Sequence, residues 1–67
     1  MARRLFRVTK EFIARIPGKS GGKQLIKVGD ELWADANQTG DTTIFFIDNI
    51  DFEVDTEIFR NSAQLKR

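Results

Sequence analysis

KQLIKVGDELWADANQTGDTTIFF, residues 23–46, is the stretch of the chain that decides the fold. It holds the only tryptophan, the densest apolar run and the two clearest turn signals. Residues 25–28 and 42–47 are rich in β-branched and aromatic side chains, which favour strands. Gly29-Asp30 and residues 36–41 have the glycine, amide and acid content of turns. The stretch therefore predicts the middle of a small, strongly bent β-sheet.

Residues 5–16 show the period of two that is typical of a half-buried strand. We expect one strand here, bent or bulged near Lys10, with its even-numbered face toward the core. The apolar residues on that face are Phe6, Val8, Phe12, Ala14 and Ile16. The chain then enters a loop at residues 17–22, where proline and three glycines end the ladder.

Seven aromatic side chains are available to fill the interior of so small a domain. Trp33 has the opposite parity to Leu32 and Ala34, so it should face outward, either under a loop as part of a second core or as a binding hot spot. Four apolar residues in succession, 44–47, predict a strand with both faces at least partly covered. The candidate core aromatics are Phe6, Phe12, Trp33, Phe45, Phe46, Phe52 and Phe59.

The C-terminal third permits two interpretations. Residues 48–51 read as a turn, and Phe52 and Val54 then alternate with acidic residues along a short strand. Asp55 is suited to cap a helical turn over residues 56–58. Beyond it, residues 58–60 form a last short strand, or residues 56–65 form one amphipathic helix.

The run Ile26-Lys27-Val28-Gly29-Asp30-Glu31-Leu32 resembles the diverging turn of the SH3-like small barrels. This resemblance implies an all-β fold, a strongly bent five-stranded barrel with one 3₁₀ or helical turn near residues 55–58. The alternative is an α+β fold with a C-terminal helix over residues 56–65. The chain has no tyrosine, so the proline-rich peptide site of SH3 domains is not implied, and the resemblance concerns the fold alone.

The length of 67 residues predicts a single small β domain, residues 1–67, with residues 1–3 and 64–67 frayed. Cysteine and histidine are absent, and no histidine is therefore available to activate Ser20 or Ser62. The acids at 51, 53, 55 and 57 lack the spacing of a calcium loop. We therefore expect no enzyme, no cofactor and no metal site. The basic N-terminus lacks an apolar segment after it, and no run is long enough to span a membrane, so a cytoplasmic protein without a membrane partner is expected.

Charge is strongly segregated along the chain. Residues 1–27 carry eight basic residues and one acid, whereas residues 28–59 carry nine acids and no base. One explanation is that basic and acidic strands lie side by side and form cross-strand pairs. Another is that the two territories are separate surfaces for partners.

Two functions follow from these surfaces. The first is a non-enzymatic protein-interaction module, of adaptor or inhibitor type, with a protein partner and an open oligomeric state. Its candidate residues are Trp33, Asp48, Asp51 and Glu53. The alternative is a nucleic-acid-binding barrel that uses the basic first strand and the glycine-rich loop. Its candidate residues are Arg3, Arg4, Arg7, Arg15, Lys19 and Lys23.

Overall fold

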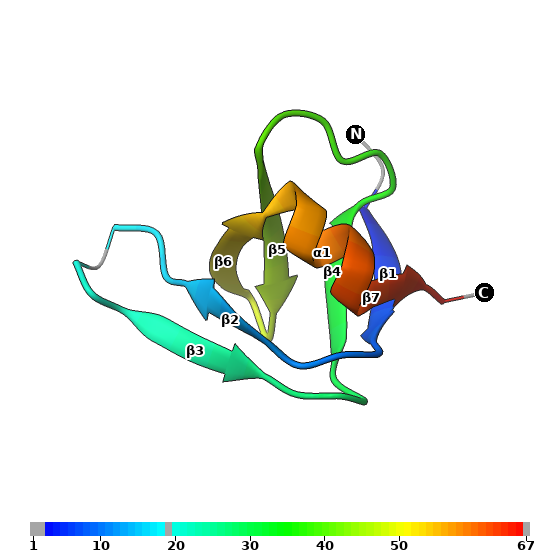
Figure 1. Cartoon of the computed structure of the whole chain (residues 1–67), viewed down its shortest axis with the longest axis horizontal. Coiled ribbons are helices and arrows are strands. Elements are labelled where there is room, and N and C mark those ends of the chain that lie inside the picture. The colour runs from blue at the N-terminus through cyan, green and yellow to red at the C-terminus, as the bar shows by residue number, and fades with distance from the viewer. Residues whose placement is uncertain (1–2, 19, 67) are drawn as a thin grey trace.

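The computed structural model describes residues 3–18 and 20–66, which form a small β-rich domain with one short helix. Seven strands make a single antiparallel sheet in the order β3-β2-β6-β5-β4-β1-β7, and α1 lies across one face of it (Figure 1). The elements are β1 (Arg3–Val8), β2 (Phe12–Arg15), β3 (Lys23–Ile26), β4 (Glu31–Asp35), β5 (Thr42–Ile47), β6 (Ile50–Asp55), α1 (Thr56–Ser62) and β7 (Ala63–Leu65).

The predicted five-stranded barrel is not confirmed, because the sheet has seven strands and is open. Within residues 3–18 and 20–66 no ladder joins the two edge strands, β3 and β7. One of the additional strands arises because residues 5–16 are not one bent strand. The N–H groups of Thr9 and Lys10 donate to the carbonyl of Ser62, at 2.7 and 3.2 Å. These bonds end β1 and turn the chain toward β2, on the other side of the sheet.

The end of the chain combines the two expected alternatives. A helix begins at Thr56, as one of them requires, so the strand expected at residues 58–60 is wrong. The helix ends at Ser62 rather than Leu65, because Ala63 and Leu65 pair with β1 opposite Val8 and Phe6. Asp55 occupies the N-cap position without a side-chain capping bond.

Both of the segments expected to fray contain residues that pair with a neighbouring strand. Arg3 lies opposite Asp35, and Gln64 and Leu65 belong to β7. Residues 1, 2 and 67 lie outside the described residues. The helix in the described part of the chain is too short and too polar to cross a membrane.

The core lies between the inner face of the sheet and α1. Strand alternation places Phe6 and Val8 of β1 and Phe12 and Ala14 of β2 inside, as predicted. Leu32 and Ala34 of β4 also lie inside. Phe45 is fully buried at the centre. The apolar core consists of Phe6, Val8, Phe12, Ala14, Ile26, Leu32, Ala34, Phe45, Phe52, Val54, Phe59 and Ala63.

Two aromatics expected among the core candidates lie on the opposite, solvent face. Trp33 points outward, as its parity indicated, and Phe46 is only partly buried beside it. Residues 44–47 were expected to have both faces at least partly covered: Phe45 is fully buried, Phe46 and Ile47 are partly buried, and Ile44 is half exposed. No described element covers that face, because α1 packs against the other one.

Positive φ angles define two of the turns. Gly29 has a φ of 94° between β3 and β4, as the Gly-Asp pair predicted. Asp48 and Asn49 have φ angles of 51° and 66°, the left-handed pair that a two-residue type I′ hairpin requires. This turn lets β5 and β6 pair along their full length, from Thr42–Asp55 to Ile47–Ile50.

Candidate functional site

An apolar row crosses the solvent face of the sheet. Leu5 of β1 lies opposite Trp33 of β4, which lies opposite Phe46 of β5. Directly opposite residues project from the same face of an antiparallel sheet and touch one another. Ile44 lies two positions before Phe46 and therefore on the same side. We call these four residues, Leu5, Trp33, Ile44 and Phe46, the outer patch.

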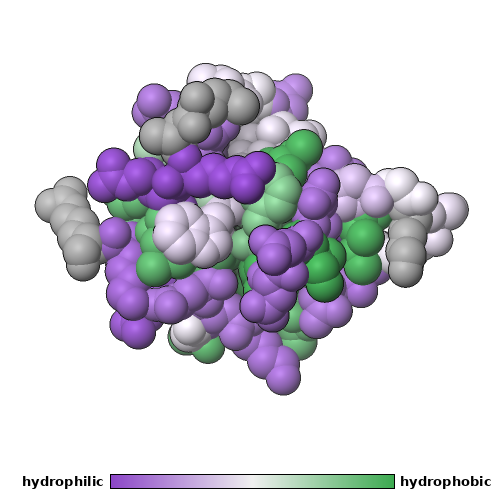
Figure 2. All heavy atoms as spheres, turned by 180° about the vertical axis from the view of Figure 1, so that it is seen from behind, coloured by the Kyte–Doolittle hydropathy of each residue, from purple (hydrophilic) through white to green (hydrophobic). Residues whose placement is uncertain are grey.

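The outer patch is accessible. Trp33 keeps 50% of its surface exposed, and Ile44 is equally open. Figure 2 shows the side of the molecule turned away from the view of Figure 1, where hydrophobic and hydrophilic residues alternate over the surface. Tryptophan is enriched among the residues that dominate binding energy at protein interfaces.

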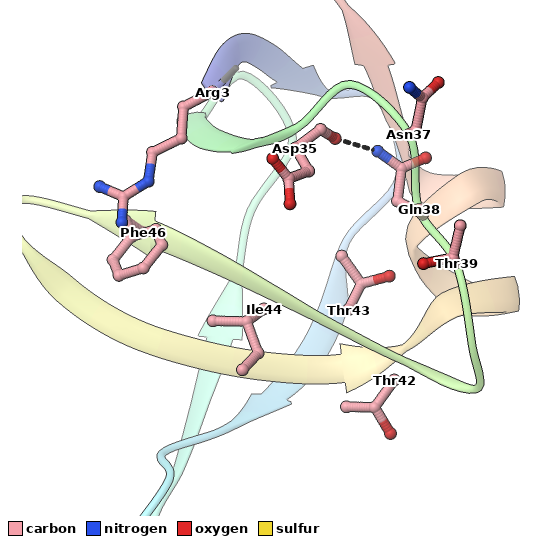
Figure 3. A pocket seen from close by; sticks show the side chains of 9 residues that line it. All are labelled: Arg3, Asp35, Asn37, Gln38, Thr39, Thr42, Thr43, Ile44 and Phe46. Carbon is pink, nitrogen blue, oxygen red and sulfur yellow. Dashed lines mark hydrogen bonds between the residues drawn. The ribbon is translucent and has the colours of Figure 1, made fainter. Parts of the chain in front are cut away.

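Arg3 holds one side of the outer patch in place. Its guanidinium carbon lies 3.9 Å from the centroid of the Phe46 ring, within the range of a cation–π interaction. Asp35 is the cross-strand neighbour of Arg3. Figure 3 shows the guanidinium stacked over the ring at the margin of a groove.

That groove has a volume of about 730 Å³ and lies between β5 and the loop that joins β4 to β5. The loop is held at both sides. The Gln38 amide donates to the carbonyl of Asp35, and the Gln38 carbonyl accepts from Arg60 of α1 at 2.6 Å. The wall that the loop forms is therefore polar and anchored, and β5 contributes the apolar side chains of Ile44 and Phe46 to the lining. The lining residues are Arg3, Asp35, Asn37, Gln38, Thr39, Thr42, Thr43, Ile44 and Phe46.

The structure brings three of the four protein-interaction candidates to the same face. Asp51 continues the row of Trp33 directly opposite Phe46, and Glu53 lies opposite Ile44. The outer patch thus has an acidic margin along β6. Asp48 lies instead in the turn between β5 and β6, at the end of the hairpin.

Glu53 and Asp55 share one cationic partner. The Nε atom of Arg15 lies 3.5 Å from Oε1 of Glu53, and its Nη2 atom lies 3.3 Å from Oδ1 of Asp55. All three side chains are partly exposed, so these pairs contribute little to stability. Asp51, which lies directly opposite Phe46, forms no ion pair within residues 3–18 and 20–66.

The nucleic-acid candidates are distributed over the sheet. Arg7 lies opposite Glu31, Arg15 pairs with β6, and Lys23 lies on the β3 edge. Arg4 lies opposite Ala34 and is exposed, Arg3 stacks on Phe46, and Lys19 lies outside the described residues. Antiparallel pairing places basic β1 beside acidic β4 and basic β2 beside acidic β6. The charges that are segregated in the sequence are therefore interleaved in space.

Glu31 has a further cationic neighbour. The Lys66 ammonium donates to its carboxylate, and this bond, with the charge of Lys66 and a smaller contribution from Arg7, holds the pKa of Glu31 below its ordinary value. The contact links the segment after β7 to β4 across β1.

Sequence reasoning missed part of the site. Leu5 and Ile44 were not among the candidate site residues, Phe46 was assigned to the core, and Arg3 was considered only as a phosphate contact. The available signal was the adjacent pair Phe45-Phe46, because only one of two consecutive strand residues can face a one-sided core.

The described residues contain no group of three histidine, cysteine or acidic side chains placed to hold a metal ion. Comparison of the chain with protein-family models, with curated proteins and with solved structures found no significant match.

Proposed function

We propose that the protein is a non-enzymatic interaction module, of adaptor or inhibitor type, that binds a protein partner through the outer patch. The observation that carries this proposal is the half-exposed Trp33 in register with Leu5 and Phe46. Tryptophan in such a position supplies a large rigid contact area, and tryptophans are enriched among the residues that dominate binding energy.

The charges around the outer patch suggest the chemistry of the partner. Asp51 lies beside Phe46, and Glu53 lies beside Ile44. A partner with an apolar centre and a basic side chain on the β6 side would satisfy both features. Arg3 is already engaged on the Phe46 ring, so an acidic partner group is less well matched there.

We propose further that the sheet is an SH3-like barrel that remains open. A Gly-Asp turn lies between β3 and β4, where the resemblance places its diverging turn, and a helical segment directly precedes the last strand. These positions support the resemblance. They imply nothing about proline-rich ligands, because the chain has no tyrosine.

Affinity capture with matched variants tests the function. Trp33→Ala removes the centre of the outer patch, and Ile58→Ala removes a similarly exposed apolar side chain on α1. We expect wild type and Ile58→Ala to capture the same proteins from a lysate, and Trp33→Ala to lose them by tenfold or more. Trp33 is the only tryptophan, so binding of a purified partner should also shift its fluorescence emission.

Both variants must be folded for this comparison, which circular dichroism checks. If folded Trp33→Ala retains every partner, the outer patch is not the binding surface. Replacement of Asp51 by Lys should weaken capture less than Trp33→Ala, because a charge at the margin of an interface contributes less than its centre.

Nucleic-acid binding is the alternative function and has its own measurement. A titration of labelled DNA and RNA at about 50 mM salt should show no binding, because the arginines are interleaved with carboxylates. Affinity that is present at low salt and falls steeply as salt rises would favour the alternative.

A further inference from the structure

The β3 strand offers a free backbone edge at the end of the sheet. Together with β2 it forms a hairpin that extends away from α1 (Figure 1). The N–H of Ile16 donates to the carbonyl of Gly22 at 3.0 Å, just beyond the Arg15–Lys23 pair. Hydrogen-bonded pairs alternate in an antiparallel ladder. Gln24 and Ile26 therefore bond toward β2, and Lys23 and Leu25 direct their backbone groups outward.

Local contacts agree with this alternation of inward-facing and outward-facing backbone groups along β3. The Gln24 side-chain amide donates to the Leu25 carbonyl at 3.4 Å, which places that carbonyl outside the ladder. The edge ends at Lys27, whose N–H donates to the Asp30 carboxylate at 3.0 Å and whose carbonyl accepts from the Asp30 N–H at 3.1 Å. The available edge is therefore short.

The side chains along this edge have a distinct pattern on the solvent face. Leu25 is 43% exposed and lies opposite Ile13, which is 60% exposed. Lys23 and Lys27 lie two positions to either side of Leu25. In the described part of the chain neither lysine has an ion-pair partner. The edge thus presents a basic, an apolar and a basic position in alternation.

We propose that the β3 edge binds an extended acidic peptide segment, which adds to the sheet as an antiparallel strand. An apolar side chain of the peptide lies opposite Leu25. It extends the apolar row that Ile13 and Leu25 form across β2 and β3. Carboxylates two residues to either side lie opposite Lys23 and Lys27. Main-chain hydrogen bonds to an exposed sheet edge supply affinity in such complexes, and alternate side chains supply specificity.

The same pattern disfavours a second copy of this chain. Antiparallel pairing of two β3 strands about Leu25 would place Lys23 of each copy opposite Lys27 of the other. Like charges directly opposite one another destabilise a strand pair, and edge lysines are a common protection against such pairing. The lysines therefore disfavour a self-complex and favour an acidic strand.

An NMR titration of the ¹⁵N-labelled full chain tests the proposal. The probe is an acetylated and amidated peptide, Thr-Glu-Thr-Val-Thr-Glu-Thr, and the control is the same composition without alternation, Thr-Thr-Glu-Glu-Val-Thr-Thr. We expect the first peptide to shift the amide signals of residues 23–27 and of β2, and the second to bind at least tenfold more weakly. No shift at millimolar peptide, or shifts centred on Trp33, would overturn the proposal.

A charge exchange gives a stricter test. The double variant Lys23→Glu and Lys27→Glu should lose the acidic peptide and bind a version with lysine in place of both glutamates. Both side chains are exposed, so the variant should remain folded, and its amide spectrum shows whether it does. Failure of the folded variant to bind the lysine peptide would contradict charge recognition at this edge.

Backbone pairing is separated from plain charge attraction by N-methylation of the peptide. A methyl on the valine nitrogen, which faces Leu25, should abolish binding, whereas a methyl on an adjacent threonine nitrogen should leave it. Equal binding of both methylated peptides would rule out strand addition. The site is independent of the outer patch, so Trp33→Ala should retain the peptide even if the proposed function fails.

Discussion

Thr43 and Thr56 are buried polar residues that connect the sheet to the helix. Their hydroxyl oxygens lie 2.8 Å apart, one in β5 and the other at the start of α1. We expect Thr56→Val to cost about 1–2 kcal/mol, because it leaves the Thr43 hydroxyl buried without its partner. Urea unfolding followed by circular dichroism measures this loss.

The double variant Thr43→Val and Thr56→Val is the control for that prediction. Removing both hydroxyls removes the unmet polar group, so the double variant should be less destabilised than the sum of the single ones. Additive losses would mean that the two hydroxyls do not act as a pair.

Single residues could largely be assigned to a face from the sequence. The alternation of Phe6 and Val8, and of Leu32 and Ala34 around Trp33, is sufficient because side chains in a strand change face at every step. Phe46 was misassigned because a continuous apolar run carries no alternation. The exposure of Phe46 depends on the absence of any covering element on that face, which the local sequence does not encode.

The hairpin of β5 and β6 is paired along its full length. Its turn contains a backbone conformation that destabilises the protein slightly and that a substitution can relieve. Asn49 adopts a φ of 66°, which asparagine tolerates but glycine adopts freely. We expect Asn49→Gly to stabilise the protein by about 0.5 kcal/mol in the same unfolding assay. The gain is small because glycine also gives the unfolded chain more freedom.

Gly29→Ala is the converse control at the turn between β3 and β4. An added Cβ would meet no heavy atom within 4 Å, so any loss comes from the φ of 94° alone. A loss of about 1 kcal/mol is expected. A stabilised Gly29→Ala, or a destabilised Asn49→Gly, would contradict the role given to these backbone angles.

Element boundaries were the least predictable part of the fold, because they depend on distant partners. The break at residues 9–11 requires the carbonyl of Ser62, which accepts from Thr9 and Lys10. The helix end at Ser62 depends on the pairing of Ala63 with Val8. The local sequence of one segment does not show that the other segment will pair with it.

Pairing of strands also explains the charge distribution of the whole molecule. The sequence separates basic residues from acidic ones, whereas the sheet places Arg15 beside Glu53 and Arg7 beside Glu31. Cross-strand pairing was one of the explanations available from the sequence. It could not be chosen there, because the choice requires the strand order.

The apolar core joins the sheet to α1, and Phe45 lies at its centre. The Phe45 ring centroid lies 5.7 Å from that of Phe12 in β2, 5.5 Å from that of Phe52 in β6 and 6.0 Å from that of Phe59 in α1. Replacing a buried phenylalanine by alanine costs about 3–5 kcal/mol. A domain of this size has a total stability of roughly 3–10 kcal/mol.

We therefore expect Phe45→Ala to be largely unfolded, or to unfold at a much lower temperature than wild type in a thermal melt followed by circular dichroism. Phe46→Ala is the matched control, because it removes the same side chain from the next position of the same strand. Phe46 lies on the solvent face and is only partly buried, so its loss should cost about 1 kcal/mol. Equal destabilisation by the two substitutions would mean that the sheet buries both of its faces, and the outer patch would then be part of a second core.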